Sequence, residues 1–239
     1  MRNLLCVCIL SLVCCALCAI GATPATAFGG ASVRLVYAER TGDTSSSKEY
    51  LIDKTANGYR IQLFNQGIKR VIVTDHKLNT LLEDYDNPAK GDTLTFRREG
   101  RSLRLTGTLD GKPMDKGFEV DGLWFGSVLL LRDVVLTGQQ ESEFYMTKPE
   151  EERVVKLVAL RQETETLTIA GAPCEAVKYK YTVPGIQGLF WKSYYWYRLS
   201  DGLLVKTEET RGLPGTQKVH SELIAESVLP ELPLVAQLP

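Results

Sequence analysis

Short segments of alternating apolar and polar residues, separated by turn signals, recur along most of this chain, and they restrict its fold more than any other feature. In the segment 59–64, Tyr59, Ile61 and Leu63 share one face while Arg60 and Gln62 share the other. Dipeptides typical of tight hairpin turns separate such segments at Asn57-Gly58, Asp110-Gly111 and Asp201-Gly202. The pattern predicts an antiparallel sheet that is covered on one face.

The remaining segments predict the same kind of structure with little helix. Leu123–Val135 is the best helix candidate, with Asp121 as its N-cap and Gly138 near its end. Pro113–Gly117 is expected to be a loop, and Lys148–Arg153 a charged turn. Further strands are predicted at residues 32–41, 50–53, 70–74, 78–85, 166–169, 176–182, 190–199, 203–210 and 218–225. We therefore expect a mainly β (α+β) fold.

The first 27 residues have the pattern of a secretory signal peptide. Arg2 is their only charged residue, and the stretch 4–20 is apolar except for Ser11. Ala25-Thr26-Ala27 gives the A-x-A pattern that signal peptidase accepts, so cleavage is predicted after Ala27. The pattern predicts export to the periplasm, with Phe28 as the first residue of the mature chain.

Two other interpretations of this leader stay open. The apolar stretch could be retained as an anchor helix, although it is shorter than the roughly 20 apolar residues that a bilayer requires. A lipidated cysteine is the second alternative, with Cys14, Cys15 and Cys18 as the candidates. None of these cysteines follows a small residue, which is the usual context for lipidation.

Residues 28–227 are predicted to form a single β domain, and residues 228–239 a proline-rich C-terminal tail. Cys174 is the only cysteine after the leader, so the exported domain has no internal disulfide and depends on its hydrophobic core. Without Arg2 it has 27 basic and 29 acidic residues, a net charge of −2. This balance gives no electrostatic reason to expect a nucleic acid or an anionic membrane surface as a partner. A monomer is expected.

The residue types needed for catalysis are sparse. His76 lies in a predicted turn and His220 in a predicted strand, and neither is placed near a candidate nucleophile by its spacing. Cys174 follows Pro173 at the start of a strand, where a buried structural thiol is the commoner outcome. Zinc and calcium motifs are also missing from the sequence. We predict no catalytic residue, no metal and no cofactor, and hence a protein that is not an enzyme.

Aromatic residues are unusually dense between residues 190 and 197, where they occupy both faces of one predicted strand. A strand covered on one side needs apolar residues on that face only. The excess could cover an apolar ligand cavity, or the strand could simply be buried between the sheet and the helix. On the first interpretation the lining of the cavity is formed by Trp124, Phe125, Leu129, Trp191 and Trp196.

Two regions of the sequence resemble outer-membrane lipoprotein-sorting proteins, that is, lipoprotein carriers, and related exported families of unknown function. In the first region the matching positions are Gly58, Arg60, Asp75, Lys77 and Tyr85. In the second region they are Gly171, Cys174, Tyr179, Trp196, Asp201, Gly202 and Lys206. The ending LPLVAQLP is also similar to the close of such chains.

The resemblance implies a curved antiparallel half-barrel with one or two helices packed in its concave face. It also implies a periplasmic protein that binds a lipid or the acyl chain of a lipoprotein in an apolar concavity. Such carriers open with a helix, whereas this chain enters its first strand almost at once, near Val33. A protein-interaction module of the cell envelope, with a filled core, is the main alternative, and a hydrolase is a further one.

Overall fold

The computed structural model describes residues 28–29, 31–185, 188, 191–210 and 216–230. The predicted leader, with its cleavage after Ala27, lies outside these residues, as does most of the predicted tail (231–239). The strands of the first half are β1 (Val33–Thr41), β2 (Thr44–Thr55), β3 (Gly58–Asn65), β4 (Ile68–Thr74), β5 (Thr80–Asn87), β6 (Asp92–Glu99), β7 (Ser102–Leu109) and β8 (Lys112–Glu119).

The second half begins with a short irregular region and continues with long strands. Its elements are β9 (Leu123–Trp124), the 3-10 turn η1 (Val128–Leu131), α1 (Arg132–Leu136), β10 (Glu141–Lys148), the 3-10 turn η2 (Pro149–Glu151), β11 (Arg153–Ile169), β12 (Ala172–Thr182), β13 (Lys192–Arg198), β14 (Leu204–Thr210) and β15 (Lys218–Val228). In the part of the chain that the structure describes, no helix is long and apolar enough to cross a membrane.

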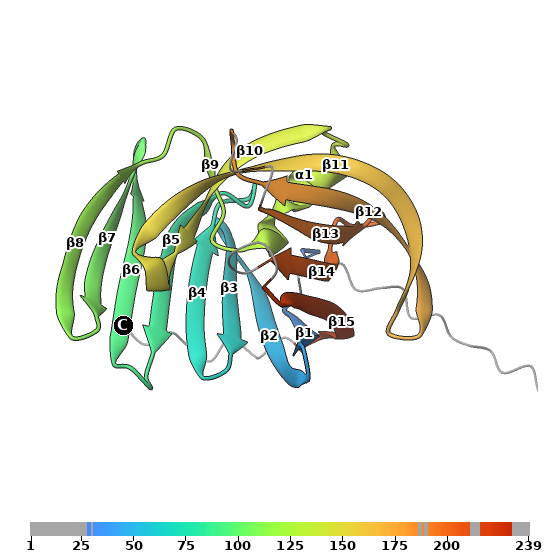
Figure 1. The fold of residues 1–239 in the computed structure, drawn as a ribbon, viewed down its shortest axis with the longest axis horizontal. Coiled ribbons are helices and arrows are strands. Elements are labelled where there is room, and N and C mark those ends of the chain that lie inside the picture. The colour runs from blue at the N-terminus through green and yellow to red at the C-terminus, as the bar shows by residue number, and fades with distance from the viewer. Residues whose placement is uncertain (1–27, 30, 186–187, 189–190, 211–215, 231–239) are drawn as a thin grey trace, which may run out of the picture.

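The described strands form one sheet of 15 strands in the order β8 to β1 and then β15 to β9. The first and last strands pair at its centre, where Val33 lies opposite Val228, and each strand then pairs antiparallel with its neighbour in sequence, except that β9 is parallel to β10. The sheet has two arms, which we call the first arm (β1–β8) and the second arm (β9–β15). It curves strongly, and β10 and β11 return across the first arm (Figure 1). The predicted curved antiparallel half-barrel with helical structure in its concave face is confirmed.

Strand alternation places one set of apolar side chains on the concave face. Val33, Ile52 and Ile61 lie opposite one another in the register, and each is 0–1 % exposed. Full burial of each such side chain contributes about 1.5–3 kcal/mol. A second, smaller cluster lies under the β5–β8 arm and contains Tyr85, Leu94, Phe96, Leu103, Leu105, Leu109, Val120 and Trp124.

The helix predicted over Leu123–Val135 is wrong in its first half. Leu123 and Trp124 form a short parallel strand against β10, and the helical turns begin only after Ser127, whose side chain caps Leu129 in place of Asp121. The intervening Gly126 approaches β4 and β5 so closely that an added Cβ would lie 3.1 Å from Ile72 and 3.2 Å from Glu83. This close packing interrupts the helix.

The turn after β2 is shifted by one residue from its predicted position. Thr55 pairs with Gly58, so the turn residues are Ala56 and Asn57 rather than Asn57 and Gly58. Gly58 has φ +150°, and a Cβ there would lie 2.0 Å from the carbonyl oxygen of Thr74. Glycine is therefore required by the approach of the end of β4, and not by the turn.

The loop predicted at Pro113–Gly117 is also wrong, because these residues lie within β8, an edge strand in which no residue is buried. Proline is tolerated at a sheet edge, where its missing N–H leaves no interior strand unpaired. The turns at Asp75-His76-Lys77, Asp110-Gly111 and Asp201-Gly202 are confirmed, as is the charged turn at Lys148–Arg153, which contains η2.

Candidate functional site

A short helical segment, η1 and α1, covers the concave face of the sheet. Five of its apolar side chains are at most 4 % exposed: Leu129, Leu130, Leu131, Val134 and Val135. They belong to the same hydrophobic cluster as the aromatic residues of the second arm. In this conformation the segment occupies the volume in which the sequence predicts a ligand cavity.

Four aromatic residues form a continuous floor on the second arm. Phe144 packs edge-on against Tyr181, with ring centroids 5.3 Å apart, and Tyr181 lies 4.0 Å from Tyr195. The hydroxyls of Tyr181 and Tyr197 are 2.5 Å apart, and Tyr197 donates to the carbonyl of Val128 at 2.9 Å. Burial raises the pKa of both Tyr181 and Tyr197 above the ordinary tyrosine value, so both hydroxyls stay protonated.

A polar network, which we call the latch, ties the region before η1 to the first arm. Arg70 donates to the buried carboxylate of Glu83 with its Nε at 2.8 Å and to the carbonyl of Gly126 at 2.6 Å. The backbone N–H of Gly126 donates to the Thr80 hydroxyl at 2.8 Å. Thr147 of β10 donates to the other oxygen of Glu83. The latch thus joins β4, β5 and β10 around one glycine.

The charges of the latch stabilise each other. Burial lowers the pKa of Arg70, but the charge and hydrogen bonds of Glu83 outweigh it, so the pKa is raised overall. Glu83 is fully buried, and the Arg70 side chain is 19 % exposed. Removal of one partner would leave a buried charge uncompensated, which makes this network a structural fastening of the segment.

The five residues predicted to line a cavity are divided between two hydrophobic clusters. Phe125 and Leu129, which is a residue of η1 itself, are buried in the main cluster together with Trp196. Trp124 is fully buried in the second cluster, and its indole N–H has no hydrogen-bond partner among the described residues. Trp191 packs at the side of the main cluster and donates to the carbonyl of Thr210 at 2.9 Å.

Trp196 lies on the opposite face of β13 from Tyr195 and Tyr197, by strand alternation. Lys178 and Lys206 stand over its ring at 5.3 and 5.0 Å. The predicted residues therefore do not share one face: Phe125 and Leu129 lie at the helical segment on the concave face, and Trp196 lies on the other face of β13.

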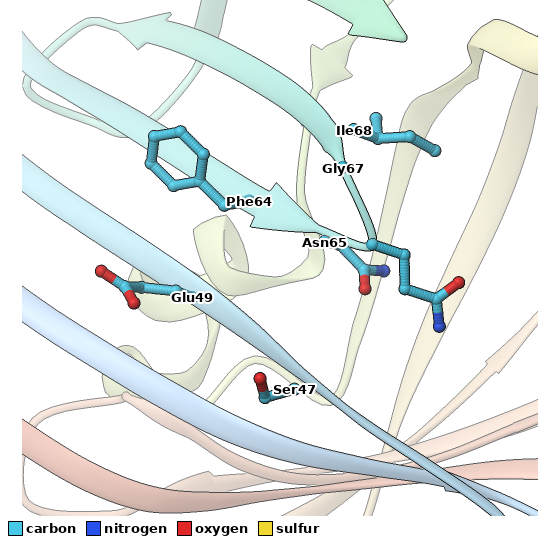
Figure 2. A pocket seen from close by; sticks show the side chains of 7 residues that line it. Ser47, Glu49, Phe64, Asn65, Gly67 and Ile68 are labelled. Carbon is cyan, nitrogen blue, oxygen red and sulfur yellow. The ribbon is translucent and has the colours of Figure 1, made fainter. Parts of the chain in front are cut away.

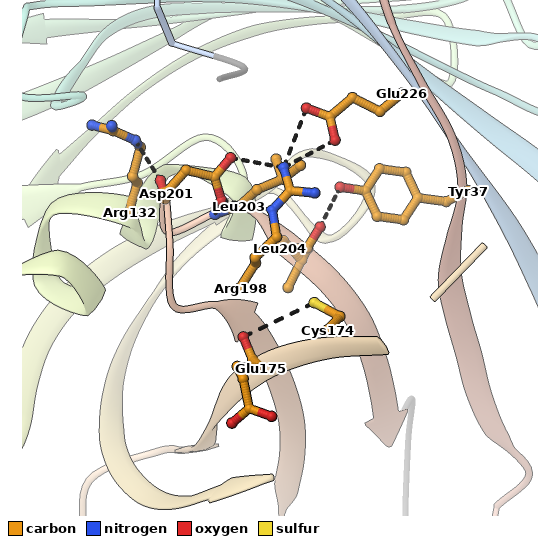
Figure 3. Close-up of polar contacts among 9 residues, drawn as sticks. All are labelled: Tyr37, Arg132, Cys174, Glu175, Arg198, Asp201, Leu203, Leu204 and Glu226. Atoms are coloured by element: carbon orange, nitrogen blue, oxygen red, sulfur yellow. Dashed lines mark hydrogen bonds and ion pairs between the residues drawn. The ribbon is translucent and has the colours of Figure 1, made fainter. Parts of the chain in front are cut away.

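One residue of the second motif, Asp201, belongs to a compact polar cluster at the β13–β14 turn (Figure 3). Arg198 donates to both carboxylate oxygens of Asp201 at 2.8 and 2.7 Å and to Glu226 at 2.9 Å. The carbonyl of Asp201 accepts from Arg132 of α1 at 2.8 Å. Burial raises the pKa of Glu226, and Arg198 partly offsets this effect. These contacts give Asp201 a structural role, since they join the turn to α1 and β15.

The candidate catalytic residues lie on separate elements. His76 is exposed in the β4–β5 turn, and His220 is exposed on β15 opposite Arg40 and Glu208. Cys174 is half-buried near Arg198, and burial raises the pKa of its thiol, which favours the unreactive protonated form. Within the described ranges, no group of three or more His, Cys, Asp and Glu residues is arranged to hold a metal ion.

Two open grooves lie away from the helical segment. The first, of about 250 Å³, runs along the ends of β2 and β3 (Figure 2) and is lined by Ser47, Glu49, Phe64, Asn65, Gln66, Gly67 and Ile68. The second, of about 210 Å³, crosses β6 and β7 and is lined by Thr95, Arg97, Glu99, Arg104 and Thr106. Neither groove involves the five residues predicted from the sequence.

Sequence analysis missed the latch entirely. The available signal was the alternation itself, because Glu83 shares a face with the buried Tyr85 in β5 and therefore had to be a buried carboxylate. Its partners Gly126 and Thr147 lie 43 and 64 residues further along the chain, and no local pattern connects them.

Comparison with known proteins relates the chain to solved structures. No family model and no curated protein matches the sequence. The fold is similar to a β-barrel-like protein of the domain of unknown function DUF1849 from Brucella abortus, with 9 % identity, a TM-score of 0.58, and coverage of 83 % of this chain and 98 % of that one. This similarity supports the half-barrel fold.

Two further similar structures are more distant. One is a LolA superfamily protein from Nitrosomonas europaea, with 12 % identity, a TM-score of 0.27, and coverage of 86 % of this chain and 89 % of that one. The other is a hypothetical lipoprotein from Escherichia coli, with 12 % identity, a TM-score of 0.34, and coverage of 80 % and 85 %. The fold assignment rests on the DUF1849 protein.

Proposed function

We propose that this protein is a non-enzymatic, exported protein of the cell envelope that binds a lipid or the acyl chain of a lipoprotein on the concave face of its sheet. The sequence pattern of the leader supports export and a periplasmic location. In this proposal the helical segment η1–α1 occupies the acyl site when no ligand is bound, and it moves aside when an acyl chain enters.

The observation that carries the proposal is the character of the helical segment. It is only nine residues long, and five of these residues are apolar and buried against the aromatic floor. An isolated helix of this length is not stable in water, so the segment is held by its packing and by the latch. An acyl chain offers the same kind of apolar surface, at about 0.8 kcal/mol for each methylene group removed from water.

The first experiment looks for the ligand directly. The exported protein is purified without detergent, its mass is measured under native conditions, and its response to an apolar fluorescent dye is recorded. We expect co-purified lipid or an increase in dye fluorescence. A lipid-free spectrum together with no dye response would rule out the proposal. The same mass spectrum identifies the first residue of the exported chain and so tests cleavage after Ala27.

A pair of matched variants tests the role of the segment. Leu129→Ala weakens the packing of the segment, and Leu103→Ala removes an equally buried leucine from the second cluster. Each should cost roughly 3 kcal/mol of stability. Only Leu129→Ala should increase the affinity for the dye, by about tenfold, because it lowers the cost of opening the site. Leu129→Val and Leu103→Val replace them if the alanine variants do not fold.

The second candidate function is a protein-interaction module. The filled concave face favours it, as does the exposed edge of β8, none of whose eight residues is buried. A partner could add a strand to this edge. Gly117→Pro would remove a backbone donor from the edge and should abolish cross-linking to such a partner, while dye binding should remain unchanged.

A further inference from the structure

A row of polar side chains crosses the concave face next to its apolar part. Glu39, Ser221 and Thr207 lie directly opposite one another on the neighbouring strands β1, β15 and β14. Alternation places them on the same face as the buried Leu35 and Tyr37. They are respectively 3 %, 2 % and 0 % exposed. The row therefore points into the interior of the half-barrel.

Two residues of the adjoining strands extend this row. Lys48 of β2 is 6 % exposed, and its Nζ lies 3.6 Å from a carboxylate oxygen of Glu39. Asn65 of β3 is directly opposite Lys48 in the register. We call these five residues, Asn65, Lys48, Glu39, Ser221 and Thr207, the polar belt.

The belt contains most of the polar side-chain atoms that are buried without a hydrogen-bond partner. Among the described residues there are four such atoms, and three of them are Thr207 Oγ1, Ser221 Oγ and Asn65 Oδ1. A buried polar atom without a partner typically costs about as much as a lost hydrogen bond. Thr207 and Ser221 lie on the adjacent strands β14 and β15, and Asn65 lies on β3 beyond Glu39 and Lys48. Together, on one interior face, the three atoms indicate a group that donates to and accepts from them.

The first open groove meets the belt only at Asn65, because Ser47, Glu49 and Phe64 face the opposite side of the sheet by strand alternation. Asn65 is part of both, and the groove is otherwise lined by the ends of β2 and β3 and the turn that follows (Figure 2). Its volume of about 250 Å³ is slightly below the roughly 300–1,000 Å³ of sites for drug-sized ligands.

We propose that the polar belt binds the neutral polar head of an amphiphile, a group that carries hydroxyls or ester carbonyls such as an acylglycerol. This proposal rests on the proposed function, since the acyl part of the same ligand would lie on the adjacent apolar surface. It adds the chemical class of the ligand and the residues that select it.

The chemistry of the unpartnered atoms favours a neutral head group. Hydroxyls both donate and accept, and a carboxamide oxygen accepts, so hydroxyl and ester groups satisfy all three atoms. A phosphate or a free carboxylate would bring a charge into surroundings that are nearly inaccessible to water, and burial of a charge costs far more than burial of a neutral polar group.

The test compares two probes of the same chain length, 1-monopalmitoylglycerol and palmitate, in displacement of a fluorescent fatty acid. The variants are Thr207→Val and Ser221→Ala, which remove the hydroxyls with little change of shape. We expect each variant to weaken binding of the monoacylglycerol by about five- to tenfold and to leave binding of palmitate unchanged. The melting temperature of the ligand-free variants should be unchanged or higher.

Ser193→Ala is the matched control on the same face, because its hydroxyl already accepts from the backbone N–H of Thr210 at 3.0 Å. It should lower the melting temperature without changing the ratio of the two affinities. Equal effects of Thr207→Val on both probes, or no effect, would overturn the role of the belt while the proposed function stands. Failure of both probes to bind the unaltered protein would overturn both.

Discussion

Two polar networks lie on the same concave face, and they differ in how completely their atoms are paired. In the latch, Glu83 accepts from Arg70 and Thr147, and Arg70 also holds the carbonyl of Gly126. In the polar belt, the hydroxyls of Thr207 and Ser221 have no partner among the described residues. Both networks are buried and both contain an ion pair.

The difference separates a structural role from a binding role. A network whose atoms are all paired rigidifies the elements that it joins, here the first arm, β10 and the helical segment. A network with unpaired neutral atoms costs stability in the folded protein, and a ligand that completes the hydrogen bonds recovers it. The latch should therefore govern stability, and the belt should govern ligand selectivity.

Loss of the latch carboxylate should have the largest effect. Glu83→Leu leaves the guanidinium of Arg70 partly buried and uncompensated, and we expect a loss of roughly 3 kcal/mol in the free energy of unfolding. Denaturation in urea measures it. The matched control is Glu49→Leu, which breaks the exposed pair with Arg34 and should cost at most about 1 kcal/mol. Equal losses in the two variants would show that the latch stabilises the fold no more than an exposed ion pair does.

The aromatic floor should make the protein sensitive to alkali. Burial raises the pKa of the floor residues Tyr181 and Tyr197 in the folded state, and also that of Tyr37 on β1. Their contribution to stability is complete below the unfolded tyrosine value of about 10 and is lost as the pH rises above it, because only the unfolded chain ionises there. Each tyrosine should cost up to about 1.4 kcal/mol for each pH unit above 10.

Tyrosinate absorbance and unfolding should therefore rise together in an alkaline titration. Tyr181→Phe should reduce the slope of the unfolding free energy against pH by the amount that corresponds to one bound proton. Tyr59→Phe is the control on the same face, since its hydroxyl is only partly buried and donates to the carbonyl of Phe28 at 3.2 Å. Ionisation of all tyrosines before any unfolding would contradict the buried floor.

Gly126→Ala tests the latch through the close packing of its backbone. The added Cβ would lie 3.2 Å from Glu83 and 3.1 Å from Ile72, so these latch neighbours must shift. We expect a loss of about 1 kcal/mol in the free energy of unfolding. Gly117→Ala on β8 has no atom within 4 Å of its Cβ and should cost nothing. A neutral result for Gly126→Ala would show that the latch tolerates displacement.

The belt variants should have the smallest effect on stability, and in the opposite direction. Thr207→Val and Ser221→Ala together should leave the free energy of unfolding unchanged or raise it by up to about 1 kcal/mol, because they remove unpaired buried hydroxyls. Urea denaturation of the ligand-free protein measures this change. A loss of 2 kcal/mol or more would show that these hydroxyls are paired within the protein.

The sequence predicted the sheet better than it predicted the site. Alternation and turn dipeptides are local, so the strands around Tyr59–Leu63 and the turn at Asp201-Gly202 could be recognised directly. The break at Gly126 could not, because it depends on contacts with Ile72 and Glu83, far away in the chain. The apolar residues of the segment 123–135 would cover most sides of a helix, so the sequence alone predicts one continuous helix there.

The candidate site shows the same limit. The aromatic residues of β13 exceed what one face requires, and alternation places Trp196, which is 6 % exposed, on the face opposite to Tyr195 and Tyr197. The belt could have been noticed in β1, where Glu39 continues the buried series of Leu35 and Tyr37. Its meaning depends on Ser221 and Thr207, which only the pairing of the last strands with the first brings beside it.

The most direct measurement is the ratio of affinities for 1-monopalmitoylglycerol and palmitate in the unaltered protein and in the Thr207→Val variant. The account predicts that the unaltered protein prefers the neutral monoacylglycerol and that the variant loses this preference while it still binds palmitate. Equal affinity for both probes in the unaltered protein, or a preference that survives in the variant, would contradict the assignment of the polar belt as the head-group site.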